Sequence, residues 1–178
     1  MSQGLKRVSV DDIVNAAGMA KGTFYQHFDS KEKYLFALIE DIHKQVFAKS
    51  EQMILSIFAS ESATSDLQSS AREFFKNLFY MPEMAFFIQN EREIDELFFG
   101  LMGEDDVNTF KQMEIVLFEK LLRLVGVDTG NIKPGVVHNY IHTLYLTMSS
   151  DLMTTADLPE TVDLLTDGLI VYIFGGAI

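Results

Sequence analysis

Two histidines, His138 and His142, have the spacing that most directly suggests site chemistry. They are four residues apart, so on a helix they share one face, which is a common arrangement of two metal ligands. The segment HNYIH lacks the glutamate of the zinc-protease motif, and no third ligand is evident nearby in the sequence. We therefore expect no metal ion. Two alternatives are left for these side chains. They form hydrogen bonds in a cavity, or they lie at a surface or interface.

No catalytic constellation accompanies the two histidines. The sequence has none of the GxSxG, phosphate-loop or GxGxxG patterns that mark nucleophilic serines and nucleotide-binding loops. It also has no cysteine, which excludes a cysteine nucleophile, a disulfide framework and a cysteine-based zinc site. The sequence thus predicts neither an enzyme nor a bound cofactor.

The segment SVDDIVNAAGMAKGTFYQHFDSKEK, which starts at Ser9, combines two short helical patterns with a turn. Ser9 can cap the first helix, and Gly18 suits the position that ends it. A second short helix fits residues 20–27, and Ser30 can cap a third. This order predicts a helix-turn-helix, in which the second helix enters the DNA major groove.

Longer helical patterns fill the rest of the chain. Apolar residues at helical spacing predict a third helix from Lys31 to about Ser60. Further helices are expected at about 66–80, 83–101, 105–125, 135–155 and 159–174. Pro82, Pro159 and the loop GVDTGNIKPG mark breaks between them. No long stretch alternates with period two, so the expected fold is all-α.

The charge is unevenly distributed along the chain. The net charge is −12, but residues 1–50 hold seven basic and six acidic residues, against seven basic and twenty acidic in the remainder. An acidic body is repelled by phosphate, and this repulsion would orient the N-terminal end toward DNA.

The composition is typical of a globular protein of the reducing cytoplasm. Hydrophobic residues make up 48% of the chain, which is ample for a core. No apolar stretch reaches the roughly 18 residues of a membrane span. The N-terminus lacks the apolar region of a signal peptide.

Residues Val8 to Leu38 resemble the N-terminal DNA-binding domain of TetR/AcrR-type bacterial transcriptional repressors, most closely through KGTFYQHF and SKEKYL. The later helices, ending in LLTDGLIVYIFG, fit the body of that family in number and order. The resemblance implies an N-terminal helix-turn-helix DNA-binding domain over residues 1–45 and a C-terminal helical bundle for ligand binding and dimerisation over 46–178. It also implies a homodimer that binds a palindromic double-stranded DNA operator and is released by a small-molecule effector.

The resemblance also assigns roles to residues of the second helix and its neighbourhood. It implies phosphate contacts from Lys21, Thr23, Tyr25 and Lys31, positions at or near the groove for Gln26 and His27, and a close backbone approach at Gly22. These types suit the roles, because lysine and hydroxyl groups bind phosphate and glutamine can bond adenine bidentately.

The chain departs from the family pattern in two respects. Ala20 stands where the family has a capping serine. The family also places an amphipathic helix before the motif, whereas MSQGLKRV precedes Ser9 here. We expect that helix to be missing and the side chains that it covers to be partly exposed. These side chains are Ile13, Phe24, Phe28 and Leu35. Three explanations of the missing helix are left open: an upstream start codon, a shortened chain, or a loss of tight DNA binding.

An alternative function follows from that departure. A chain with a defective DNA-binding unit would be a dimeric small-molecule-binding or interaction protein. Both functions need a ligand cavity and a dimer interface, and the sequence offers a set of residues for each. Residues expected to line a cavity for a small apolar or aromatic effector are Phe79, Phe87, Phe110, Met113, His142, Tyr145 and Met148. Residues expected at a twofold dimer interface are Val137, Ile141, Leu144, Leu165, Gly168, Leu169 and Tyr172. The alternative for the cavity residues is ordinary helix packing. The alternative for the interface residues is a monomer whose last helix is buried.

Overall fold

The computed structural model describes residues 4–57, 66–101, 104–124, 126–127, 130, 132–150 and 156–175, and every regular element in these ranges is a helix. The helices are α1 (Val10–Ala17), α2 (Lys21–His27), α3 (Lys31–Ile57), α5 (Leu67–Phe79), α6 (Pro82–Leu101), α7 (Glu104–Leu124), α8 (Pro134–Ser149) and α9 (Leu158–Phe174). The all-α prediction is confirmed. Within the described ranges, no helix has both the length and the apolar character needed to cross a bilayer.

Proline and glycine place the helix boundaries close to the predicted positions. Pro82 is the first residue of α6 and Pro159 the second of α9, where a missing N–H costs no helical hydrogen bond. The predicted boundaries of α5 to α9 differ by at most one residue from those observed, except at the end of α8. The predicted end near residue 155 is wrong, because α8 ends at Ser149 and the backbone of Ser150 is extended. The expected end of α3 near Ser60 lies outside the described residues.

The helix-turn-helix is held by local caps. The Ser9 hydroxyl accepts a hydrogen bond from the Asp12 N–H at 3.2 Å, and the Asp12 carboxylate accepts one from the Ser9 N–H at 2.8 Å. This reciprocal box satisfies two N–H groups of α1. Gly18 ends α1 at φ 64°, in the left-handed region that favours glycine. Ala20, as expected, gives α2 no side-chain cap.

Gly18→Ala should lower the free energy of unfolding by about 1–2 kcal/mol, because an alanine pays a steric penalty in the left-handed conformation. Gly22→Ala is the matched control, since Gly22 lies inside α2 and a Cβ there meets no atom within 4 Å. That change should stabilise the protein by about 0.5 kcal/mol. Urea unfolding measures both. If Gly22→Ala lowered the free energy of unfolding as much as Gly18→Ala, the assignment of the turn at Gly18 would be wrong.

The N-terminal stretch covers part of the helix-turn-helix, which corrects one expectation. Leu5 is buried beside Leu35, and the Lys6 backbone N–H donates to Glu93 of α6 at 2.7 Å. Leu35 is therefore only 5% exposed, and Phe24, which packs against Phe28 and Tyr34, is 2% exposed, so neither is partly uncovered. The two other side chains of that set, Ile13 and Phe28, are half-buried as expected.

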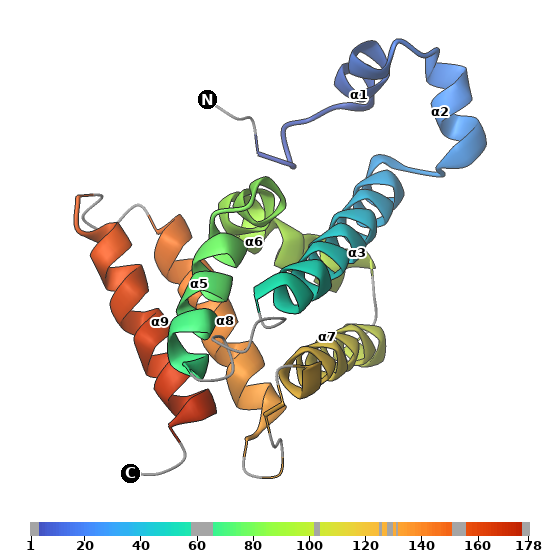
Figure 1. Ribbon diagram of the computed structural model, residues 1–178. Coiled ribbons are helices and arrows are strands. Elements are labelled where there is room, and N and C mark those ends of the chain that lie inside the picture. Colours follow the sequence, from blue (N-terminus) through green and yellow to red (C-terminus); the bar gives the residue numbers. More distant parts are fainter. Residues whose placement is uncertain are drawn as a thin grey trace.

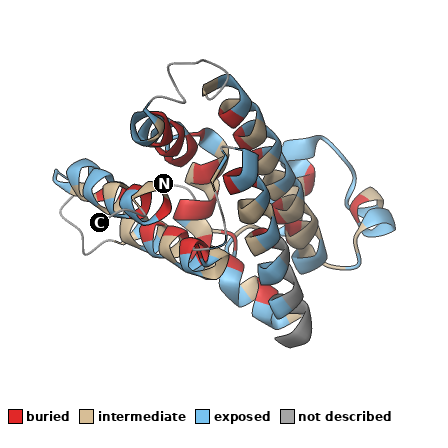
Figure 2. Ribbon diagram, turned by 60° about the horizontal axis from the view of Figure 1, so that its bottom comes forward, coloured by how far each residue is buried: buried red, intermediate tan, exposed pale blue. Residues whose placement is uncertain are grey.

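Helices α3 and α5 to α9 form the body, from which α1 and α2 project on the end of α3 (Figure 1). Helix α8 is the central element and packs against α6, α7 and α9. Its inward residues Val137, Ile141 and Leu144 are at most 1% exposed. Buried positions lie between the helices of the body, while the α1–α2 end is mostly exposed (Figure 2). The helical body can thus enclose a small-molecule site, and the exposed α1–α2 end is accessible to a macromolecule.

Candidate functional site

Most of the predicted DNA-binding residues lie on α2 and are exposed to solvent. They are Lys21, Gly22, Tyr25, Gln26 and His27, and Tyr25 is 52% exposed. The buried residue of this helix is Phe24, whose ring packs against Phe28 and Tyr34 with centroids 5.5 and 5.6 Å away. Thr23 and Lys31 are half-buried at the edges of this surface. The arrangement is that of a recognition helix anchored by its aromatic side.

Both lysines of this set make contacts within the chain. Lys21 Nζ lies 2.9 Å from an Asp11 carboxylate oxygen, and the hydrogen bond to Asp11 raises the pKa of Lys21. Lys31 Nζ donates to the Lys6 carbonyl at 3.2 Å. Exposed ion pairs of this kind contribute little to stability, so phosphate can replace Asp11 as the partner of Lys21.

A cavity of about 440 Å³ lies in the body among α3, α6, α7 and α8. Its walls are mainly apolar and aromatic, with contributions from Val46, Phe87, Phe98, Phe118 and Ile141. Polar and charged side chains occupy part of the same wall. They include His43, Glu91, Asp95, Glu114, His138 and His142. Cavities of this size and character are typical of small-molecule sites in helical bundles.

The charged part of the wall is a connected network centred on Glu114. One Glu114 oxygen lies 2.9 Å from His138 Nε2 and 3.8 Å from His142 Nε2. The other lies 3.1 Å from His43 Nε2. His142 Nδ1 lies 2.7 Å from a Glu91 oxygen. Glu91, Glu114 and His138 are buried, so this network is shielded from bulk water.

Burial and hydrogen bonding oppose each other in this network, and hydrogen bonding prevails. Burial alone would raise the pKa of Glu114, but hydrogen bonds from His138 and His43, together with the nearby His142 ring, hold that pKa far below its usual range. Burial alone would lower the pKa of His142, yet its bonds to Glu114 and Glu91 raise it to about 10. A cationic His142 beside anionic Glu114 is therefore the state at neutral pH.

Comparison with known proteins identifies the N-terminal part. Residues 1–38 match the family described as bacterial regulatory proteins, tetR family. This segment is therefore similar to the N-terminal part of tetR-family regulators. Two relatives are HTH-type transcriptional repressors named KstR2. The protein from Rhodococcus jostii is 26% identical over 137 residues, which are 68% of this chain and 67% of that protein. The protein from Mycolicibacterium smegmatis is 33% identical over 66 residues, 37% of this chain and 29% of its own length. No solved structure gives a significant match.

These matches support a DNA-binding regulator, and they confirm the resemblance drawn from KGTFYQHF and SKEKYL. We refer to α1 and α2 together as the reader. The relatives are transcriptional repressors, a class defined by binding and not by catalysis.

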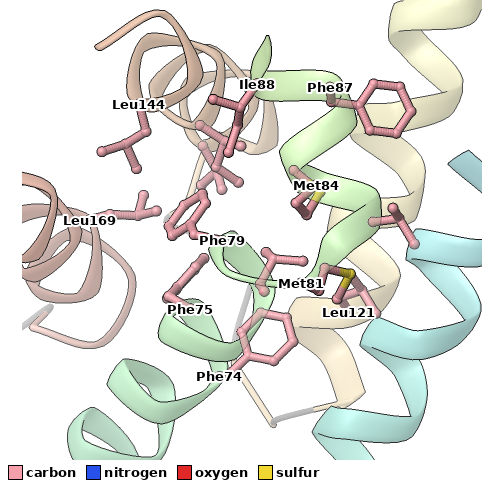
Figure 3. Close-up of a cluster of buried hydrophobic side chains, with 14 of the residues drawn as sticks. Phe74, Phe75, Phe79, Met81, Met84, Phe87, Ile88, Leu121, Leu144 and Leu169 are labelled. Carbon is pink, nitrogen blue, oxygen red and sulfur yellow. The ribbon is translucent and has the colours of Figure 1, made fainter. Parts of the chain in front are cut away.

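The cavity contains some of the residues predicted to line it. Phe87, His142 and Tyr145 do so. Phe79 does not: it is 2% exposed and stacks on Phe75 within the core, near Leu169 (Figure 3). Met148 packs against the same core and is also not a lining residue. The side chains of Phe110 and Met113, the two remaining candidates, lie outside the described residues.

The network contains residues that the sequence reasoning missed. Glu91 interrupts an apolar stripe of α6 that includes Phe87, Ile94 and Phe98, and Glu114 begins a similar stripe on α7. A charged residue at a core position of a helix was the available signal, because charge is rarely buried without a partner.

The predicted dimer surface also needs correction. Val137, Ile141, Leu144 and Leu169 are at most 1% exposed because they fill the core of the single chain, so they are not available to a partner. Leu165 is half-buried, whereas Gly168 and Tyr172 face outward. Other large apolar residues that α8 and α9 leave exposed are Val136, Leu146, Leu164 and Val171.

The raised pKa of His142 predicts a loss of stability in alkaline solution. In the unfolded chain the pKa returns to about 6.5, so the contribution of His142 is complete below that pH and disappears as pH rises toward about 10. The urea midpoint of the wild type should therefore fall over this interval more than that of His142→Gln. Equal slopes in the two proteins would contradict the assignment.

Proposed function

We propose that the protein is a homodimeric, ligand-responsive transcriptional repressor of the cytoplasm, released from a palindromic operator by a small effector. The observation that carries the proposal is the course of α3. Its first turn follows the reader directly, and its residues His43, Val46 and Phe47 line the cavity. A molecule in the cavity therefore touches the helix that carries the DNA-binding surface. We assign residues 1–45 to DNA binding and 46–178 to effector binding and dimerisation.

The cavity walls favour an effector that is mainly apolar or aromatic and carries a polar group. Phe87, Phe98 and Phe118 offer apolar surface, and Tyr145 adds a hydroxyl that donates weakly to the Met84 sulfur at 3.9 Å. Burial raises the pKa of Tyr145, so this hydroxyl stays protonated and can donate to a ligand. The polar group of the effector would meet the network around Glu114.

The proposed mechanism is a shift of population between two arrangements of the dimer. Operator DNA needs two readers separated by about 34 Å, one helical turn, or a multiple of it. An effector that binds better to another separation depletes the DNA-binding state. By thermodynamic reciprocity, operator DNA weakens effector binding by the same factor.

Exposed apolar residues of α8 and α9 support the dimer. Leu146, Leu164, Val171 and Tyr172 each keep 40% or more of their surface in the single chain. Gly168, also exposed on α9, accommodates the Tyr140 hydroxyl of the same chain, since a Cβ there would lie 3.0 Å from it, so the support for the dimer comes from the apolar residues. Two such helix pairs related by a twofold axis form a closed four-helix contact.

Fluorescence anisotropy on the DNA upstream of the protein's own gene tests the proposal. We expect tight binding that falls steeply with salt and that scrambled DNA of equal length does not reproduce. Equal affinity for both duplexes at every salt concentration would overturn the repressor function and favour a small-molecule-binding protein. Apolar and aromatic compounds that release the bound DNA would then define the effector class.

A further inference from the structure

Three side chains from two helices direct metal-binding atoms to one point in the wall of the cavity. They are Glu114 of α7 and His138 and His142 of α8. A carboxylate oxygen of Glu114 and one ring nitrogen of each histidine all lie within 4.8 Å of one another. Two imidazoles and one carboxylate form a ligand set that proteins use for Zn²⁺ and other first-row transition ions.

The separations within this set are close to those of ligands around one ion. The Glu114 oxygen lies 2.9 Å from His138 Nε2, with which it is hydrogen-bonded, and 3.8 Å from His142 Nε2. Ligands bound to Zn²⁺ at 2.0–2.1 Å in a tetrahedron lie about 3.3 Å apart. The two observed distances bracket that value, so small side-chain movements would place all three atoms around one ion.

A second layer of groups orients these ligands. His142 turns its other ring nitrogen, Nδ1, to Glu91 at 2.7 Å, which leaves Nε2 directed at the ion position. The second oxygen of Glu114 lies 3.1 Å from His43 Nε2, and the ring of His43 is stacked on Phe87 at 4.3 Å. A carboxylate behind a ligating histidine is the arrangement by which proteins fix its tautomer and ring orientation.

The site would stay open on one side. His138, His142 and Glu114 all line the cavity, so an ion held by three protein ligands keeps a coordination position that faces this space. Sites with three protein ligands and an open position bind water or a ligand atom there. A structural ion would instead be enclosed by four protein ligands.

We propose that Glu114, His138 and His142 bind one divalent first-row transition metal ion per chain, which displaces the proton of His142, with the open position directed into the cavity. The ion would let the cavity hold a small molecule through an oxygen or nitrogen atom. The proposal goes beyond the proposed function, because metal binding does not depend on whether the protein represses transcription.

Zn²⁺ titration of the full chain tests the site. The protein is stripped with a chelator, dialysed, and titrated by calorimetry without DNA. We expect one ion per chain, affinity reduced more than about 100-fold in His142→Ala and in Glu114→Gln, and reduced about 10–100-fold in Glu91→Gln. His27→Ala is the matched control for metal affinity, since it removes a histidine on exposed α2. It should leave the Zn²⁺ affinity unchanged.

Two results would overturn the proposal. One is a wild-type chain that binds no Zn²⁺, which would make the network a set of ion pairs only. The other is equal affinity in wild type and His142→Ala, which would place the bound Zn²⁺ elsewhere. His142 keeps 34% of its side chain exposed, so its alanine variant should fold, and circular dichroism checks this. The visible spectrum of Co²⁺ added to the wild type gives a second readout that needs no variant.

Discussion

Glu114→Ala should lower the free energy of unfolding of the metal-free protein by about 3 kcal/mol. The change removes the carboxylate at the centre of the network and leaves His43, His138 and His142 without their shared acceptor. Breaking a buried charge pair costs about 3–5 kcal/mol, and we expect the lower end because histidines can release their protons. Urea unfolding in the presence of a chelator measures the effect.

The same helix offers a matched control. Glu119 pairs with Arg123 on the surface of α7, where the arginine side chain is 68% exposed. Its replacement by alanine should cost less than about 1 kcal/mol, because water screens exposed pairs. Equal losses at the two positions would show that the buried network adds nothing beyond an ordinary surface ion pair.

Gln26→Ala should reduce discrimination between the operator and altered operators by about 1–3 kcal/mol, which is roughly 5–150-fold in relative affinity. Gln26 is exposed on α2, and its amide can bond one base through two hydrogen bonds. Affinity for unrelated DNA should change much less, because the phosphate contacts remain. Competition anisotropy with single base-pair substitutions measures the discrimination.

Gln45→Ala controls for the loss of a glutamine as such. Gln45 is exposed on α3, well after the reader, and donates to Asp41 at 2.8 Å. Its removal should leave discrimination unchanged. If Gln26→Ala weakened binding equally on all sequences, the residue would be a phosphate contact and the assignment to the groove would be wrong.

Local sequence signals predicted the helices but not their partners. Ser9, Gly18 and Pro82 act on their own neighbours, so the helix ends that they set could be placed to within a residue or two. The spacing of His138 and His142 likewise placed both rings on one face. Glu114 reaches them only through the packing of α7 on α8, a contact that no local pattern encodes.

The apolar stripes of α8 and α9 show that the partner of a helix face also could not be predicted from local sequence. Helical periodicity identified Val137, Ile141 and Leu144 as one apolar face and predicted that something covers it. It could not tell whether a second chain or α6 and α7 supply the cover. The structure assigns this face to the intramolecular core and leaves Leu146 and Leu164 outside.

The uninterrupted course of α3 makes it a lever arm. Its 27 residues contain no proline and no glycine, the residues at which helices usually kink. At 1.5 Å per residue, the cavity wall at His43 lies roughly 18 Å along the axis from Lys31, where the reader is attached. A tilt of roughly 10° about the cavity would therefore move the reader by about 3 Å, close to the 3.4 Å rise of one base-pair step. In the proposed dimer, a shift of this size at the cavity would move each reader by about one base-pair step relative to the operator.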